Sequence, residues 1–488
     1  MSTDATQAGE RQARVISGPS AVGICIASMI GSGIFTVTGL IGPEVVTSSN
    51  LMIAWVVGGF VALCGGLAVA ELAAMRPRAS AQYEVVHEAM GPTFGYLKGM
   101  ITLLVGYVSS LAAVALVSGE YVENLVPTLD PRMIATVFLV VLGAIHATTV
   151  LGGQRFNDLL VFFKVVLVLA FIVGGFLLIG DPLLPTPEMI EIARDTMPDS
   201  PIGTLPAAAT AAEVDRHLRS AAGPSVFSGA IGLAIVSISF AYLGWATAAE
   251  VAGEIRRPGR NLPLAIIGSV VAVGSLYLLV NVVYVSTVPP AAMLVPSEDG
   301  SALKPMGDIG AVVAKHLLGE RGGTFVTAAL VFLFVSTLST GLMTGGRIIA
   351  AMAWRNELPT AAGELNRRGA PTVAVAAMLV MTVPIVWSST LASLFEYVGL
   401  LTTIAMMLAM VSVLVMRVKA PDMPRPFRIP LYPFPPLVSI GIGLWLVVSS
   451  ALEDWEPVLY TMLTIVAIVL LRPVLVRPEP SKQSRSST

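Results

Sequence analysis

Three small residues, Gly31, Ser32 and Gly33, interrupt an apolar segment that reads MIGSGIF over residues 29–35. Glycine tolerates the backbone angles that an unwound turn requires. A helix that restarts after such a turn begins with amide groups that have no intrahelical acceptor, and its positive dipole end favours an anion. The chemistry expected here is the binding of a carboxylate or another anion by backbone N–H groups.

A second break of the same kind is expected at FAYLGW, residues 240–245, five apolar segments further along the chain. Unpaired backbone groups at membrane depth are tolerated only where they line a cavity or are buried in protein. Breaks at matching positions of two halves are typical of transporters built from inverted repeats. Close packing against a neighbouring helix is the alternative reading for such small residues.

One charge, Lys164, lies inside an apolar segment, nine residues after Arg155. Nine residues of helix rise roughly 13 Å, which is close to the middle of a ~30 Å hydrocarbon core. A lysine at that depth is costly and is a functional candidate by default. The alternative is that its long side chain reaches back to the inner interface.

The elements that must position these residues are membrane helices. The 488-residue chain is 55% hydrophobic and only 12% charged, and its mean hydropathy is +0.81. A soluble protein carries about twice that share of charge. The net charge of −2 gives no indication of nucleic acid as a partner, and Cys25 and Cys64 lie in apolar segments, where they are expected to pack rather than to form a disulfide.

About twelve apolar blocks are long enough to span a bilayer as helices. They lie near 17–41, 51–75, 94–122, 132–150, 157–180, 226–252, 263–288, 323–352, 371–389, 391–416, 434–452 and 456–476. Lys and Arg concentrate in the segments that are cytoplasmic if the N-terminus is cytoplasmic, so both termini are expected inside. The outer loop 181–225 contains a possible short amphipathic helix near 207–220, and it reads either as a solvated surface loop or as a lid.

Several motifs, in order along the chain, resemble those of the amino acid–polyamine–organocation transporter superfamily. They are GSGIF, AELAAMRPRASAQYEVVHEAMGP (70–92), FAYLGWATAAEVAGEIRRPGRNLPLAI (240–266), STGLMTGGRIIAAMAWRNELP (339–359), NRRGAPT (366–372) and APDMPRPFRIPLYPFPP (420–436). The resemblance implies an all-α membrane protein of the leucine-transporter fold, similar to proton-coupled bacterial amino acid permeases. About twelve helices then form a 5+5 inverted repeat, with helices 1 and 6 broken and two further helices at the C-terminus.

These expectations divide the chain into six parts. They are a cytoplasmic tail (1–16), the first repeat (17–180), an extracytoplasmic loop (181–225), the second repeat (226–416), helices 11 and 12 (417–476) and a second cytoplasmic tail (477–488).

The resemblance also implies which residues bind an amino acid. The amides of Ser32 and Gly33 would hold the substrate carboxylate, and carbonyls at Met29 and near Phe240 and Leu243 would accept from its ammonium. Phe240 takes the position of an aromatic gate. The complete set of expected substrate-binding residues is Met29, Gly31, Ser32, Gly33, Phe240, Ala241, Leu243 and Gly244, with Trp245 and Glu250 as possible selectivity residues.

In the proton-coupled relatives, a lysine on helix 5 stands where sodium-coupled relatives bind an ion. Lys164 matches that position, and its expected partners are Ala27 and Ile30 on helix 1 and Ser336 on helix 8. A buried ammonium could lose its proton when the cavity opens inward, so proton coupling without sodium is expected. A fixed charge that only replaces the ion is the alternative.

The sequence therefore predicts a secondary transporter that imports amino acids across the cytoplasmic membrane, as a monomer or homodimer. An amino acid or polyamine exchanger is the alternative, and a membrane sensor that binds without transporting is the alternative from another class. No enzyme is expected, because no nucleophile–base pair, metal cluster or phosphate loop appears in or beside the spans, and neither cofactor nor metal is expected.

Overall fold

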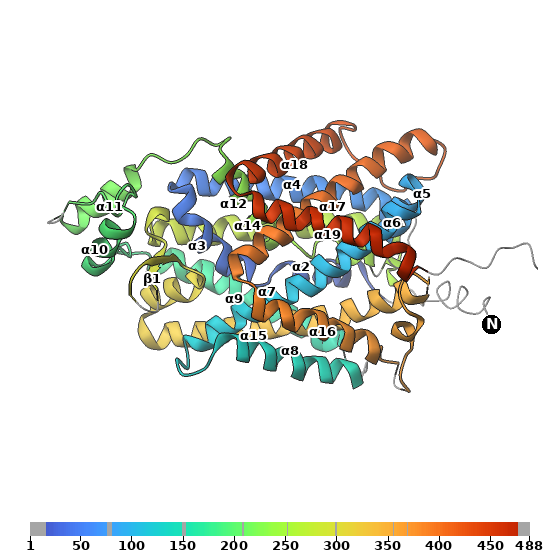
Figure 1. Ribbon diagram of the computed structural model, residues 1–488, viewed down its shortest axis with the longest axis horizontal. Helices are drawn as coiled ribbons and strands as arrows, with labels where there is room; N and C mark the ends of the chain where they lie inside the picture. The colour runs from blue at the N-terminus through green and yellow to red at the C-terminus, as the bar shows by residue number, and fades with distance from the viewer. Residues whose placement is uncertain are drawn as a thin grey trace, which may run out of the picture.

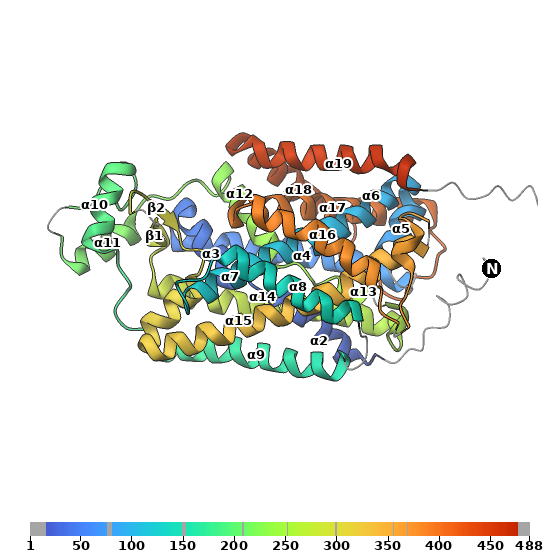
Figure 2. The same cartoon turned by 60° about the horizontal axis from the view of Figure 1, so that its bottom comes forward.

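The computed structural model describes residues 16–75, 81–148, 153–206, 209–250, 252–297, 300–354, 356–367 and 369–476. In that part of the chain almost all regular structure is helical, so the predicted all-α class is confirmed. Figures 1 and 2 show an elongated bundle whose helices run mostly along its long axis. Figure 2 shows α9 (Gly153–Leu178) at one edge of the bundle and α19 (Trp455–Leu475) at the opposite edge.

The first half of the bundle begins with two helices that share one predicted span. Its elements are α2 (Gly18–Met29), α3 (Gly33–Val45), α4 (Ser48–Met75), α5 (Ala81–Met90), α6 (Pro92–Leu103), the π-helix η2 (Leu104–Ser109), α7 (Ser110–Glu123), α8 (Pro131–Thr148) and α9.

The second half repeats the division of its first span. Its elements are α12 (Gly229–Ala241), α13 (Thr247–Glu250), η3 (Ala252–Glu254), α14 (Pro258–Thr287), η4 (Pro290–Ala292), α15 (Ile309–Trp354), η5 (Thr360–Gly363), α16 (Thr372–Ser388), α17 (Leu391–Lys419), α18 (Phe434–Glu453) and α19.

The predicted spans correspond to these helices. Nine helical segments of the described chain are long and apolar enough to cross a membrane. Three shorter apolar helices, Phe162–Leu178, Gly229–Ala241 and Thr372–Ser388, coincide with the other predicted spans. The two spans predicted on either side of residue 390 are separate helices, α16 and α17, because Thr390 caps the second one: its side chain accepts a hydrogen bond from the Ser393 amide at 3.3 Å.

Side-chain caps also fix where the two broken spans begin. The Ser17 hydroxyl accepts from the Ser20 amide at 3.3 Å at the start of α2, and the Ser228 hydroxyl accepts from the Ile231 amide at 3.4 Å at the start of α12. Each cap satisfies one of the amides that a helix start leaves without an intrahelical acceptor.

The loop 181–225 contains more regular structure than the sequence predicts. The expected amphipathic helix is α11 (Ala211–Ser220), which a capping box of Thr210 and Glu213 starts. A second helix in this loop, α10 (Pro187–Thr196), is additional, and the antiparallel strands β1 (Leu294–Pro296) and β2 (Leu303–Pro305) lie in the later loop between α14 and α15. All four gather at one end of the bundle, which we call the cap end; the other, the base end, carries α5 (Figures 1 and 2).

Two irregular turns alter long helices. Gly319 has φ 70° inside α15, so that helix consists of two parts, and the predicted span near 323–352 corresponds to the second. The π-helix η2 interrupts the predicted span 94–122, which the sequence treats as one continuous helix. A single π-turn inserts into an α-helix most often at a functional site.

Candidate functional site

The first break lies where it is predicted. Helix α2 ends at Met29, and Ile30 closes it by donating its amide to the Ile26 carbonyl at 2.9 Å. Helix α3 restarts at Gly33 after Ser32, whose side chain makes no cap bond. The Ser32 hydroxyl is buried and has no hydrogen-bond partner among the described residues. Of the first amides of α3, that of Phe35 donates to the Ser32 carbonyl at 2.9 Å, and no side chain caps the helix start.

The second break lies between α12 and α13. Helix α12 ends at Ala241, and α13 begins at Thr247. Between them Gly244 has φ 102°, a conformation that glycine adopts readily and other residues rarely adopt.

The two breaks are in direct contact through these glycines. A Cβ atom placed on Gly33 would lie 2.6 Å from Cα of Ala241, and one placed on Gly244 would lie 2.5 Å from the carbonyl carbon of Ser28. Each distance is shorter than any two carbon atoms tolerate without movement, so both positions require glycine. The contacts are reciprocal, since each break packs its glycine against the backbone of the other.

A cavity of about 190 Å³ lies at this meeting point. The residues expected to bind substrate all line it: Met29, Gly31, Ser32, Gly33, Phe240, Ala241, Leu243 and Gly244. Trp245 also lines the cavity. The side chain of Glu250 lies outside the described structure. The structure thus brings the predicted residues together at one cavity, and their role towards substrate stays a prediction.

Tyr277, on α14, joins the two breaks and was not predicted. Its hydroxyl lies 2.6 Å from the Met29 carbonyl and 3.1 Å from the Ala241 carbonyl, one from each break. Its ring lies 5.6 Å from that of Trp55 and 5.4 Å from that of Tyr242, and all three side chains are fully buried. Met29, expected to accept from a substrate ammonium, therefore already has a hydrogen-bond donor.

Lys164 is buried, with 3% of the residue exposed, and it connects α9 to two other helices. Its Nζ donates to the Ala27 carbonyl at 3.2 Å, as expected, and to the Thr337 hydroxyl at 2.8 Å. The expected partners Ile30 and Ser336 make no hydrogen bond with it in the described structure. Adjacent residues of a helix point about 100° apart, and the sequence does not fix which of Ser336 and Thr337 faces α9.

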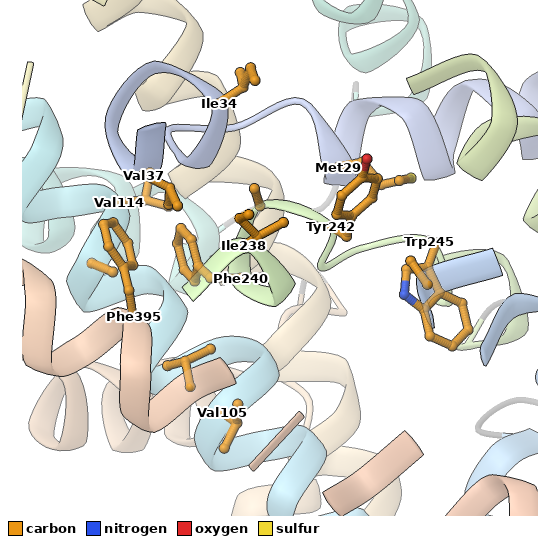
Figure 3. Packing of buried hydrophobic residues seen from close by; sticks show 14 of the residues in the cluster. Met29, Ile34, Val37, Val105, Val114, Ile238, Phe240, Tyr242, Trp245 and Phe395 are labelled. Carbon is orange, nitrogen blue, oxygen red and sulfur yellow. The ribbon is translucent and has the colours of Figure 1, made fainter. Parts of the chain in front are cut away.

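Aromatic side chains lie on the cap-end side of the cavity (Figure 3). The Phe240 ring lies 4.3 Å from the ring of Phe395 on α17. Figure 3 shows these two rings side by side, with Trp245 on the far side of the view. Further towards the cap end, Tyr121 donates to the Phe35 carbonyl at 2.8 Å. The aromatic gate predicted at Phe240 therefore packs against a partner, Phe395, that the sequence did not reveal.

Towards the base end, a buried carboxylate ties α4 to α17 and to the segment that follows it. Glu71 is 1% exposed, and its two oxygens accept from Arg417 at 2.9 and 2.8 Å. It also accepts from the Ile429 amide at 2.7 Å, and Arg425 lies 3.5 Å away. The described structure thus gives Glu71 these two arginines as partners.

The described residues contain no group of three or more His, Cys, Asp or Glu side chains that could hold a metal ion. Among the described residues that line the cavity, the polar groups are backbone groups, hydroxyls, the indole of Trp245 and the ammonium of Lys98. Such an arrangement can bind a small zwitterion by hydrogen bonds and dipoles.

Comparison with known proteins agrees with a site for a small zwitterion. The sequence model of a family described as amino acid permease matches residues 16–469. The chain is similar to the serine/threonine exchanger SteT of Bacillus subtilis (strain 168), with 24% identity over 442 residues, 89% of this chain and 90% of that protein.

It is also similar to large neutral amino acids transporter small subunit 2 of Homo sapiens, with 26% identity over 421 residues, 84% of this chain and 71% of that protein. The cystine/glutamate transporter of Homo sapiens is 25% identical over 444 residues, 89% of this chain and 79% of that protein. These names cover different substrates, so similarity alone does not select one amino acid.

Proposed function

Since this chain belongs to the amino acid permease family, we propose that it imports amino acids across the cytoplasmic membrane by alternating access, coupled to protons and independent of sodium. The family and the relatives show that the chain is a multi-pass membrane transporter of amino acids and not an enzyme. The direction, the coupled ion, the membrane and the orientation of the termini belong to the proposal.

The observation that carries the proposal is the meeting of two broken helices at one cavity. The start of α3 offers the amides of Ser32 and Gly33, which suit a carboxylate. Carbonyls at the end of α12, near Phe240 and Leu243, suit an ammonium. Every amino acid carries both groups, so backbone atoms alone can hold the part that all substrates share.

Alternating access is supported by the asymmetry of the cavity. Phe240 and Phe395 are in ring contact on its cap-end side. The lining residues of α15 and α17, among them Thr344 and Ala409, follow the level of the breaks towards the base end. If the base end faces the cytoplasm, as the positive-inside rule predicts, this ring contact lies on the outer side of the cavity, where a gate would stand.

Proton coupling is proposed for Lys164. Its ammonium bridges α2 and α15 through Ala27 and Thr337, beside the first break. A proton lost from this amine would remove the charge that holds both partners, so protonation and the position of α2 would change together.

An exchanger is the second candidate, favoured by one relative that is itself named an exchanger. In the described structure the Lys164 ammonium is held by a carbonyl and a hydroxyl, with no carboxylate bonded to it. In an exchanger this ammonium keeps its proton and serves as a fixed charge that ties α2 to α15.

Uptake of a labelled amino acid panel into proteoliposomes tests the proposal. The vesicles are either empty or loaded with unlabelled amino acid, with and without an inward proton gradient and with and without sodium. Uptake into empty vesicles that rises with the proton gradient is expected. Uptake that occurs only into loaded vesicles would show that the protein is an exchanger and not a net importer. Uptake that strictly requires sodium would contradict the proposed role of Lys164 in proton coupling.

A further inference from the structure

The wall of the cavity that faces the two breaks is formed by α6, η2, α7 and α17. Figure 3 shows Val105 of η2 on the opposite side of the view from Met29. Small residues are frequent on this wall, including Gly106, Ala405 and Ala409. If the breaks hold the carboxylate and the ammonium, the side chain of the substrate lies against this wall.

The π-turn determines which residues of the α6–α7 segment face the cavity. Val105 and Ser110 are five residues apart, and both line it. In an α-helix, residues five apart point about 140° away from each other. In a π-turn they face the same way, since its hydrogen bonds join residues i and i+5. The Ser110 hydroxyl closes this turn by donating to the Val105 carbonyl.

Most hydroxyls on the cavity wall already donate to a backbone carbonyl. Thr102 donates to Lys98, Thr337 donates to Leu333, and Ser110 donates to Val105. Thr344 likewise donates to the carbonyl of Thr340 one turn earlier.

Thr402, on α17, differs from these residues. It lines the cavity, it is 7% exposed, and its hydroxyl is buried with no hydrogen-bond partner among the described residues. Among the described residues that line the cavity, the other buried hydroxyl without a hydrogen-bond partner is that of Ser32, which lies at the first break. An unpaired buried hydroxyl costs free energy that a ligand with a matching group recovers.

One charged side chain of the described residues, that of Lys98, lies on the wall. Lys98 lines the cavity and is 9% exposed, and no Asp or Glu of the described residues lines it. A lysine side chain or a polyamine placed there would lie near the ammonium of Lys98, which carries the same charge.

From these observations we propose that the substrate is a neutral amino acid whose side chain carries a hydroxyl, and that Thr402 is the residue that binds this hydroxyl. This inference rests on the proposed function, since it assumes that the breaks hold the amino acid head. Thr402 is then a specificity residue: it separates threonine from valine and serine from alanine, pairs that differ little in shape and by one hydroxyl.

The test is binding of these four amino acids to the purified full-length protein, measured by ligand-dependent thermal stabilisation. We expect threonine to bind about ten-fold more tightly than valine, and serine more tightly than alanine. In Thr402→Val the threonine affinity falls to the valine level while valine binding is unchanged. Thr461→Val is the matched control, because Thr461 is 1% exposed, its hydroxyl also has no partner among the described residues, and it lies on α19, away from the cavity.

Two results would overturn the inference and leave the proposed function standing. One is a wild-type protein that binds valine as tightly as threonine, and the other is a Thr402→Val variant that loses affinity for both equally. If no amino acid of a full panel binds or is transported, the proposed function itself fails.

Discussion

Gly33 lies so close to Ala241 that a methyl group on Gly33 would stand 2.6 Å from the Ala241 Cα. The start of α3 and the end of α12 thus meet backbone to backbone, at the level where both helices are interrupted. Nothing but glycine at position 33 permits this approach, and the amides proposed to bind the substrate carboxylate belong to the same turn.

Replacing Gly33 by Val should abolish substrate binding. The added carbon atoms push α3 away from α12, and overpacking of this kind costs about 1–3 kcal/mol. Uptake and ligand-dependent stabilisation are both measured. Gly23→Ala is the control in the same broken span, because a Cβ at Gly23 meets no atom within 4 Å. Full transport by the Gly33→Val variant would contradict the proposal that the two breaks form the substrate site.

Tyr277→Phe should reduce transport by roughly ten-fold while the protein still folds, since it deletes one hydrogen-bonding group worth about 1 kcal/mol at the breaks. Tyr284→Phe, on the same helix α14, is its control: Tyr284 is equally buried, but its hydroxyl has no partner among the described residues. Equal transport rates in the two variants would show that the hydroxyl of Tyr277 does not position the breaks.

Lys164→Ala should remove the dependence of uptake on the proton gradient. Thr337→Val should weaken that dependence, because it removes the hydroxyl that accepts from Lys164, whereas Ser336→Ala should not. Initial rates are recorded at several external pH values. An unchanged pH profile in Lys164→Ala would exclude this amine as the coupling group, and equal effects at 336 and 337 would contradict the observed register of α15.

Glu71→Gln should destabilise the protein by about 3 kcal/mol, because it leaves a partly buried arginine without its counter-charge. Thermal unfolding in detergent measures the loss. Asp215→Asn is the contrasting variant, because it breaks an exposed ion pair with Arg219 and should change stability by less than about 1 kcal/mol. A loss at Glu71 no larger than the loss at Asp215 would mean that α4 and α17 are not held by this pair.

Glu357, in the segment after α15, should contribute to the pH dependence of the protein's stability. Burial raises the pKa of this carboxyl from 4.5 to about 7, and the charge of Arg472 offsets part of that rise. The folded state therefore binds the proton more tightly than the unfolded state, and stability falls as pH rises from 4.5 to 7. Glu357→Gln should raise the melting temperature relative to wild type at about pH 8 and have little effect at about pH 4. A difference in melting temperature between Glu357→Gln and wild type that stays the same from about pH 4 to about pH 8 would contradict this prediction.

The breaks were predictable because they are local: glycine clusters and a change in residue pattern within one apolar block indicate an unwound turn. Lys164 was predictable because its cost at mid-membrane depends only on depth. The partners of these residues were not. Tyr277, Phe395 and Arg417 are ordinary members of other helices, and only tertiary packing brings them to the cavity and its two ends.

The sequence also could not predict the rotation of α15 about its axis or the position of the irregular turns. Ser336 and Thr337 are equally suitable acceptors for a lysine, and the rotation of α15 selects the second. The π-turn at η2 has no glycine or proline pattern that separates it from the α-helix around it, so Ser110 could not be placed on the cavity wall. Thr402 is one of many threonines in apolar segments, and its lack of a partner exists only in three dimensions.

The reciprocal packing of Gly33 on Ala241 and of Gly244 on Ser28 also limits how the protein can move. Neither break can rotate or unwind further unless the other does, so the four half-helices around them travel as one mechanical unit during transport. Two of the contacts between this unit and the surrounding helices are the bond from Lys164 to Thr337 and the ring contact between Phe240 and Phe395. In the proposed proton-coupled cycle, the first contact would respond to the protonation of Lys164 and the second to the presence of a substrate.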